Sequence, residues 1–206
     1  MAQRRAIISV WDKTGIVELA RALAKAGYEI LSTSKTAVAV REAGIPVTEI
    51  ADYTGSPEIL GGRVKTLHPK IAGGILTTRK DDTVEPIDIV VCNLYAFEDG
   101  LVREATHDEL VELIDIGGVT LLRAAAKNHA FVTIVPDPKH YAAIIAELTK
   151  TGSISAEIAI VPERKTNQGA SIPCAGVATV TPNAVAAPSS SHTPASGRQR
   201  CTWPAT

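Results

Sequence analysis

The chain has 206 residues, of which 45% are hydrophobic and 21% are charged, and its formal net charge at pH 7 is −1. This balance is typical of a soluble globular domain with a full core, and it argues against a dedicated nucleic-acid or membrane-surface binder. The three cysteines are widely spaced, which predicts neither a disulfide framework nor a zinc site. Because neither a signal peptide nor an apolar run of about 20 residues is visible, we expect a cytoplasmic protein.

The first part of the chain alternates short apolar runs with amphipathic segments. The apolar runs over residues 5–10, 28–33 and 46–50 predict strands, and helical spacing predicts helices over residues 16–26 and 36–43. Glycine follows each predicted helix, which is a common way for a helix to end.

The second part repeats this alternation. Residues 87–92 (IDIVVC) and 130–135 (AFVTIV) predict strands, and residues 107–114, 119–127 and 138–148 predict helices. Because the strands are continuously apolar, the sequence predicts an α/β fold with a mostly parallel sheet and helices on both faces. Ligands of such folds bind beyond the carboxyl ends of the strands, so the loops at those ends are the candidate site.

The end of the chain differs in composition. After Val161 the sequence is rich in Pro, Ser, Thr and Ala and shows neither helical nor strand periodicity. This composition predicts a poorly structured tail. We therefore divide the chain into a folded domain over residues 1–154 and a disordered tail over residues 155–206.

Two predicted loops lead from a strand into a helix and resemble anion sites. The first is Trp11-Asp12-Lys13-Thr14-Gly15, and the second is Ser32-Thr33-Ser34-Lys35-Thr36. The free N–H groups at a helix start, together with a lysine, are suited to a phosphate. The alternative is a pair of ordinary capped helices.

A basic, glycine-rich segment lies in the middle of the chain. GGRVKTLHPKIAGG (residues 61–74) holds Arg63, Lys65, His68 and Lys70 between two glycine pairs. Glycine permits close approach of the backbone to a ligand, and a lysine or arginine stabilises charge that develops on a reacting oxygen. The alternative is a solvated basic loop.

Cys92 and Asn93 end the strongest predicted strand. The Asn93 amide has the donor and the acceptor needed to read an amide or purine edge. Cys92 is better interpreted as a small strand residue than as a nucleophile. The histidines share no metal-ligand spacing, so no metal site is predicted.

The segment IDIGGVTLLRAAAKNH (residues 114–129) places an acid and a base at opposite ends of an apolar run. In one straight helix, Asp115 and Lys127 would lie about 18 Å apart. Either the two charges cap a core helix, or both ends border one elongated ligand. Paired glycines favour a loop before a helix that begins near Val119.

Several of these motifs together resemble one family. SVWDKTG, the hydroxyl-rich loop, GGRVKTLHPKIAGGIL, CNLYAF and IDIGGVTLLRAAAKNH occur in the order and spacing of the IMP cyclohydrolase domain of the bifunctional purine-biosynthesis enzyme. The similarity runs from about residue 5 to residue 148. It implies a methylglyoxal-synthase-like fold and closure of a formamido-imidazole-carboxamide ribonucleotide to IMP, without a metal or cofactor.

The resemblance also implies a set of site residues. The catalytic residues would be Lys65, Tyr95, Asp115 and Lys127, and Lys127 matches the proton donor/acceptor of the family. The residues on the phosphate and ribose side would be Trp11, Asp12, Lys13, Thr33, Ser34, Lys35 and Thr36. The residues near the base would be Arg63, Val64, Thr66, Cys92, Asn93, Ile116, Gly117 and Gly118.

Three departures from the family pattern stand out. Ser34-Lys35 replaces Gly-Gly, so side chains either crowd the phosphate or supply a compensating charge through Lys35. Trp11 replaces a small residue, and the similarity ends near Ser155, without the family's transformylase domain. Any transformylase activity would then belong to another chain.

Two other functions compete with the enzyme. The same fold serves as a non-catalytic sensing module for nucleotides or phosphates, and the chain would also fit a truncated, inactive fragment. A small-molecule nucleotide is the expected ligand, with no nucleic-acid or membrane partner and with a possible homodimer.

Overall fold

The computed structural model describes residues 3–80 and 83–154, which form a five-stranded parallel sheet with helices on both faces. The strand order is β3-β2-β1-β4-β5, and every neighbouring pair is parallel. The bounds are Arg4–Val10 for β1, Tyr28–Ser32 for β2, Thr48–Glu49 for β3, Ile89–Asn93 for β4 and Thr133–Val135 for β5. The predicted α/β fold is confirmed, and the predicted tail lies outside the described residues.

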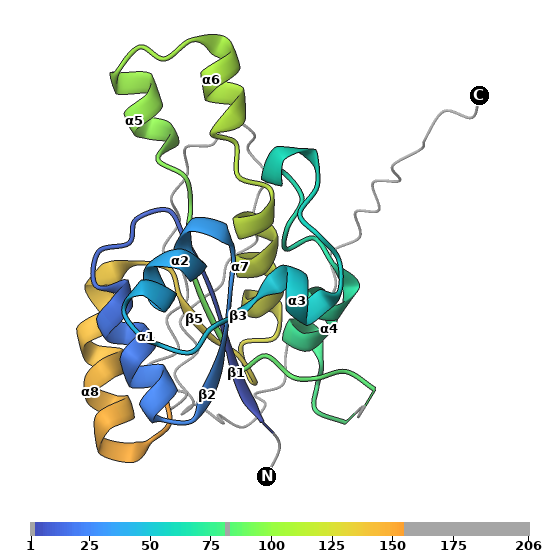
Figure 1. The fold of residues 1–206 in the computed structure, drawn as a ribbon, viewed down its shortest axis with the longest axis vertical. Coiled ribbons are helices and arrows are strands. Elements are labelled where there is room, and N and C mark those ends of the chain that lie inside the picture. The colour runs from blue at the N-terminus through green and yellow to red at the C-terminus, as the bar shows by residue number, and fades with distance from the viewer. Residues whose placement is uncertain (1–2, 81–82, 155–206) are drawn as a thin grey trace, which may run out of the picture.

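Helices flank the sheet on two sides (Figure 1). One side carries α1 (Ile16–Lys25), α2 (Ser34–Glu42) and α8 (Tyr141–Thr151), which follows a short 3-10 turn, η2 (Pro138–His140). The other side carries α3 (Ile50–Thr54), α4 (Pro69–Leu76) and α7 (Gly117–Lys127). No helix in the described part of the chain is long and apolar enough to cross a membrane.

The alternation of side chains along β1 explains why both sides are covered. Ala6, Ile8 and Val10 join the core beneath α1 and α8, whereas Ile7 joins the core beneath α4 and α7. Successive strand side chains point to opposite faces, so a continuously apolar strand requires packing on both. Helices thus cover both faces of the sheet, so we expect a ligand at the ends of the strands.

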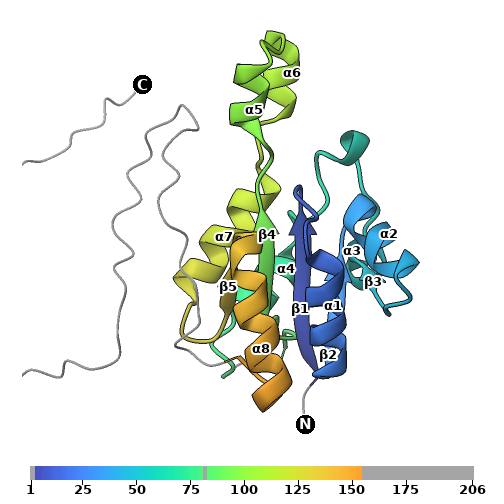
Figure 2. The ribbon, with the colours of Figure 1, turned by 90° about the vertical axis from the view of Figure 1, so that its left-hand side faces the viewer.

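A helical arm projects beyond the carboxyl ends of the strands (Figure 2). It consists of α5 (Phe97–Val102) and α6 (His107–Glu112). A capping box between Thr106 and Glu109 begins α6, since each side chain hydrogen-bonds the backbone of the other residue. The arm follows the end of β4 and leads back to α7, so it borders the candidate site.

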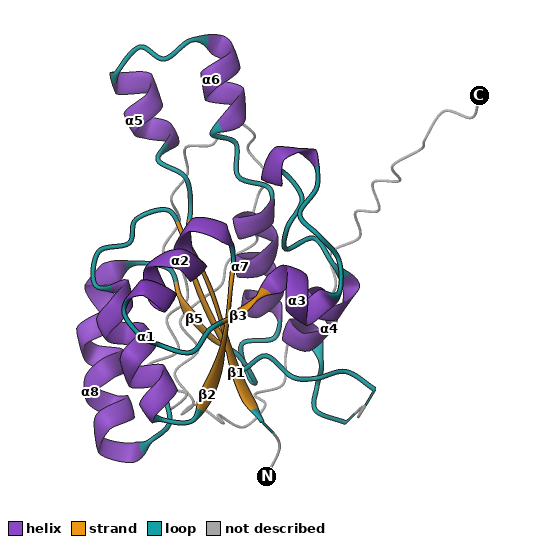
Figure 3. Cartoon of the chain, in the orientation of Figure 1, coloured by secondary structure: helices purple, strands orange, loops and turns teal. Residues whose placement is uncertain are grey.

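Figure 3 shows the observed helices, strands and loops, and some of the predicted boundaries differ from them. The strand predicted over residues 46–50 has only two residues, because Pro46 has no N–H to donate and Ile50 already begins α3. The basic, glycine-rich segment, for which no helix was predicted, contains α4, which begins at Pro69 with the His68 ring accepting from the Lys70 N–H. The helix expected from Val119 begins two residues earlier, at Gly117.

Candidate active site

The loop after β1 is fixed by the side chain of Asn93, the last residue of β4. Asn93 Oδ1 accepts from the N–H groups of Trp11 (2.7 Å) and Asp12 (2.9 Å), and its Nδ2 donates to the carbonyl of Asp12 (2.9 Å). Lys13 Nζ turns back to the carbonyl of Trp11 at 3.2 Å. Asn93 thus uses its amide within the protein, and its role in reading a base edge stays a prediction.

The loop after β2 is held to the end of β1 by two buried hydroxyl groups. Thr36 Oγ1 donates to the carbonyl of Val10 (3.1 Å), and Thr33 Oγ1 lies 3.4 Å from Ser9 Oγ. The nine-residue helix α2 begins at Ser34, and the Lys35 side chain is exposed. The first turn of a helix favours an anion, because its N–H groups lack intrahelical acceptors.

A hairpin positions the next group of predicted residues. Ile59 and Val64 form an antiparallel bridge, and the short 3-10 turn η1 (Leu60–Gly62) closes it. Gly61 and Gly62 have φ values of 64° and 89°, which suit glycine, so the turn explains this glycine pair without a ligand. Val64, Lys65 and Thr66 follow the turn.

Arg63 ties this hairpin to the helical arm. Its guanidinium hydrogen-bonds the carboxylate of Glu112 in α6, and both side chains are exposed. The Glu112 carboxylate raises the pKa of Arg63, and the guanidinium in turn lowers the pKa of Glu112. In the structure Arg63 therefore links two segments that border the site, and a contact with a base stays a prediction.

The start of α7 is packed against its surroundings with no room for side chains. A Cβ at Gly117 would lie 2.7 Å from Thr66 Oγ1, and one at Gly118 would lie 2.7 Å from Asp115 Oδ2. Asp115 Oδ1 accepts from the Gly118 N–H at 2.6 Å, so the carboxylate also caps the helix. The adjacent Ile116 is exposed.

Asp115, Tyr95 and Lys65 share one electrostatic environment. Burial raises the pKa of Asp115, while hydrogen bonds from the Gly118 and Tyr95 backbone and the charge of Lys65 oppose that rise. Burial and then the charge of Asp115 raise the pKa of Tyr95, so the phenol stays protonated near neutral pH. A carboxyl group with a raised pKa has a carboxylate that is a stronger base, and a protonated phenol is a hydrogen-bond donor.

Cys92 and Trp11 complete the surroundings of Tyr95. Burial raises the pKa of the Cys92 thiol, and its Sγ lies 3.8 Å from the carbonyl of Gly118. These properties suit a packed strand residue and not a nucleophile. Trp11 is 48% exposed and meets Tyr95 edge to face, with ring centroids 5.1 Å apart. Trp11 thus connects the loop after β1 with Tyr95.

Lys127 does not join these groups within one chain. It ends α7, next to Asn128, whose side-chain amide donates to the carbonyls of Ile75 and Thr77 at the end of α4. Ten residues separate Gly117 from Lys127, about 15 Å along a helix. The Lys127 side chain is exposed and makes no hydrogen bond or ion pair within residues 3–80 and 83–154. Its predicted catalytic role stays a prediction.

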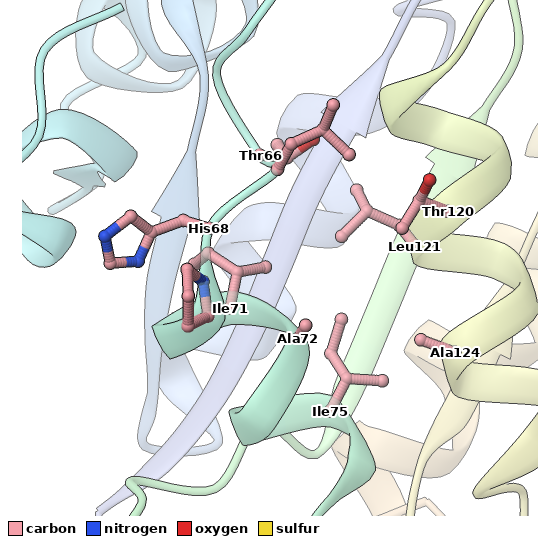
Figure 4. A pocket seen from close by; sticks show the side chains of 10 residues that line it. Thr66, His68, Ile71, Ala72, Ile75, Thr120, Leu121 and Ala124 are labelled. Atoms are coloured by element: carbon pink, nitrogen blue, oxygen red, sulfur yellow. The ribbon is translucent and has the colours of Figure 1, made fainter.

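A cavity of about 300 Å³ lies between α4 and α7 (Figure 4). Thr66 lies at one end of it, and Ile75 and Ala124 lie at the other. Its lining is almost entirely apolar, which suits a nucleotide poorly. Among the described residues, no cluster of His, Cys, Asp and Glu would hold a metal ion.

The structure adds Glu58 to the predicted site. Its carboxylate accepts a hydrogen bond from Ser34 Oγ, and Glu58 Oε2 lies 4.0 Å from Lys65 Nζ. Glu58 lies outside the basic, glycine-rich segment that contains Lys65, and that segment is defined by its basic residues. The sequence pattern therefore did not indicate an acid seven positions before Lys65. By contrast, Lys70 lies away from this group, with Nζ 2.7 Å from the carbonyl of Tyr53.

Comparisons with known proteins show which family the chain belongs to. Residues 15–120 match the MGS-like domain family. The chain is 53% identical over 163 residues to the bifunctional purine biosynthesis protein PurH of Persephonella marina, and 53% identical over 161 residues to PurH of Sorangium cellulosum. These matches cover 75% and 74% of the chain but only 32% and 31% of the relatives. The chain thus matches about a third of their length.

A solved structure supports the same assignment. The structure titled "Crystal structure of ForH" matches with a TM-score of 0.64 and 33% sequence identity, over 78% of this chain and 86% of that one. Together with the parallel sheet and the loops at its carboxyl edge, these matches define the family. The chain belongs to the MGS-like domain family and is similar to a segment of the bifunctional purine biosynthesis protein PurH.

Proposed function

We propose that the chain is an IMP cyclohydrolase, which closes the purine ring of 5-formamidoimidazole-4-carboxamide ribonucleotide to give IMP and water. The observation that carries this proposal is the shared environment of Asp115, Tyr95 and Lys65 beside two anion-type loops. The names of the PurH relatives place them in purine biosynthesis, which supports a purine nucleotide as the ligand.

The phosphate of the nucleotide would bind between the loop after β1 and the start of α2. Both lie at the carboxyl edge of the sheet, and hydroxyl groups of Thr33 and Thr36 hold them together. The first turn of α2 favours an anion, and Lys13 supplies a positive charge once its Nζ leaves the backbone carbonyl of Trp11. The base would then extend toward Lys65 and Asp115.

The reaction needs a base, a donor and a fixed conformer. The carboxamide nitrogen attacks the formyl carbon, a C–N bond forms, and the formyl oxygen takes up negative charge. The carboxamide nitrogen loses one proton and the formamido nitrogen loses another, and the oxygen takes up both. A C=N bond to the formamido nitrogen replaces the C–O bond, so the oxygen leaves as one water. The electrons balance without a redox partner, so the chemistry rests on proton transfer and positioning.

Each of the three groups suits one part of this reaction. Asp115, with a raised pKa, would orient the carboxamide and accept its proton. Lys65 would stabilise the developing oxyanion, and Tyr95 would donate a hydrogen bond to the same oxygen. Lys127 has no role in this scheme, because within one chain it lies at the far end of α7 from the other three residues.

A sensing module remains the second candidate function, and one observation favours it. Asp115 already accepts a hydrogen bond from Gly118, and Lys65 lies beside Glu58, so both groups have partners in the protein. A module that only binds nucleotides would need the two loops but no proton transfer. Binding without turnover would distinguish the two.

The direct test is to incubate the full chain with the formylated substrate and to follow the purine ultraviolet spectrum. We expect conversion by the wild type and a large loss in the Asp115→Asn and Lys65→Met variants. Nucleotide binding with no conversion above the uncatalysed rate would reject the enzyme and favour the sensing module. Calorimetric titration with IMP supplies the binding measurement.

A further inference from the structure

Glu58 links the two halves of the candidate site through the two oxygens of one carboxylate. One oxygen accepts from Ser34 Oγ at the start of α2, and the other lies 4.0 Å from Lys65 Nζ. The charge of Glu58 also contributes to the raised pKa of Tyr95. The single negative charge of Glu58 thus acts on the start of α2, on Lys65 and on Tyr95.

Ser34 is an unusual residue for its position. Its φ is 36°, in the left-handed region that favours glycine, yet it is a serine and uses its hydroxyl to bind Glu58. A glycine at this position would fit the backbone but would lack that hydroxyl. The serine therefore supplies a contact that the backbone conformation alone does not require.

The surroundings of Glu58 are those expected for a bound anion. The start of α2 favours negative charge, and Lys65 offers a positive charge on the opposite side. A nucleotide phosphate entering between the two loops would compete for the same groups. Glu58 belongs to the exposed residues, so it can leave without unfolding the core.

We propose that Glu58 occupies the anion position of the candidate site and is an internal competitor that a ligand must displace. Glu58 is then a specificity-determining residue. A simple anion gains little by displacing it, whereas a nucleotide gains further contacts along the site. Displacement would also free Lys65 for the reacting oxygen, a consequence that rests on the proposed function.

The test is calorimetric titration of the full-length chain with inorganic phosphate and with IMP. The variants are Glu58→Gln, Ser34→Gly and their combination. Glu49→Gln is the matched control, because Glu49 forms an exposed ion pair with Arg41 and makes no hydrogen bond or ion pair with Ser34 or Lys65. Thermal unfolding of each variant checks that it is folded.

We expect Glu58→Gln to tighten phosphate binding by about 2- to 5-fold, the range expected for loss of an exposed ion pair. The gain for IMP should be no larger. Ser34→Gly should have a smaller effect in the same direction, and in that background Glu58→Gln should add less than it does alone. Glu49→Gln should leave both affinities unchanged.

Several results would overturn the proposal. These are unchanged or weaker phosphate binding in folded Glu58→Gln, equal effects in Glu49→Gln, and no anion binding by any variant. If Glu58→Gln is unfolded, phosphate binding by Ser34→Gly is the test instead. Unchanged phosphate binding by that variant would reject the competitor role of Glu58. If Glu58→Gln binds phosphate more tightly but the wild type does not close the purine ring, the competitor role of Glu58 stands and the proposed enzymatic function is rejected. If the wild type closes the ring but Glu58→Gln does not change phosphate binding, the enzymatic function stands and the competitor role is rejected.

Discussion

The two ends of α7 differ in the burial and in the interactions of their charged side chains, although one sequence motif contains both. At the start, Asp115 is partly buried, caps the helix and lies in the electrostatic environment of Tyr95 and Lys65. At the end, Lys127 is exposed, next to the loop that leads to β5. The helix separates an acid in the candidate site from a base at its other end.

This difference shows that a continuous motif need not form one continuous site. In a parallel α/β fold, a helix that begins at the carboxyl edge of the sheet ends near the amino edge. Asp115 and Lys127 serve one ligand only if that ligand spans the apolar cavity beside α7 or if a second chain contributes. We therefore expect the two ends to respond differently to substitution.

The largest effect is expected for Asp115→Asn, which keeps the size of the side chain and an oxygen that can cap Gly118. If Asp115 accepts the proton of the carboxamide, kcat should fall by about 10²- to 10⁴-fold. The rate of purine formation at saturating substrate measures this. A variant with normal kcat and weakened binding would assign Asp115 to binding alone.

Lys65→Met is expected to have the next largest effect. Methionine keeps the aliphatic bulk of the side chain and removes the charge that would stabilise the oxyanion. We expect kcat to fall by about 10²-fold or more, with a smaller change in KM. Lys70→Met is the matched control, because Lys70 comes from the same basic segment but contacts Tyr53. Equal losses in both variants would contradict a specific role for Lys65.

Asp115→Asn should also raise the free energy of unfolding near neutral pH. Burial raises the pKa of Asp115 above its ordinary value of 3.8, so the folded protein holds that proton more tightly than the unfolded chain. Wild-type stability therefore falls as the pH rises through the folded pKa, and this penalty is absent below the ordinary value. Urea denaturation at about pH 4.5 and about pH 7.5 should show a smaller gain at the lower pH. A gain that is equal at both pH values would exclude this cause.

The smallest effect is expected for Lys127→Met. Because one chain does not bring Lys127 to the other reactive groups, kcat should stay within about threefold of the wild type. A loss of kcat as large as that of Lys65→Met would show that Lys127 takes part in catalysis. Mixing Lys65→Met chains with Lys127→Met chains would then locate it, since recovered activity requires that a second chain supplies the lysine.

Much of the fold followed from the sequence, because β-branched runs and helical spacing depend on local residues. The strands around Ile7 and Val90 are apolar on both faces, and this pattern alone predicts a sheet covered on both sides. The helix at Pro69–Leu76 was missed because its glycine pair was interpreted as room for close approach to a ligand. Gly74 instead gives room for the carbonyl of Glu85, which lies 2.8 Å from where a Cβ would be.

The site was only partly predictable for a related reason. The loops at the carboxyl edge follow from the order of the elements, so Lys13, Thr33 and Asn93 were expected to lie at one edge. The partners of the side chains depend on tertiary contacts, which no spacing encodes. Neither the binding of the Asn93 amide to the loop after β1 nor the contact between Ser34 and Glu58 was visible in the sequence.

The most direct test of the account is a crystal structure of the full chain with IMP bound. We expect the phosphate between the loop after β1 and the start of α2, and the base near Lys65, Tyr95 and Asp115. Glu58 should have left Ser34. IMP in the apolar cavity between α4 and α7, or beside Lys127 alone, would contradict the placement of the site at the carboxyl edge of the sheet.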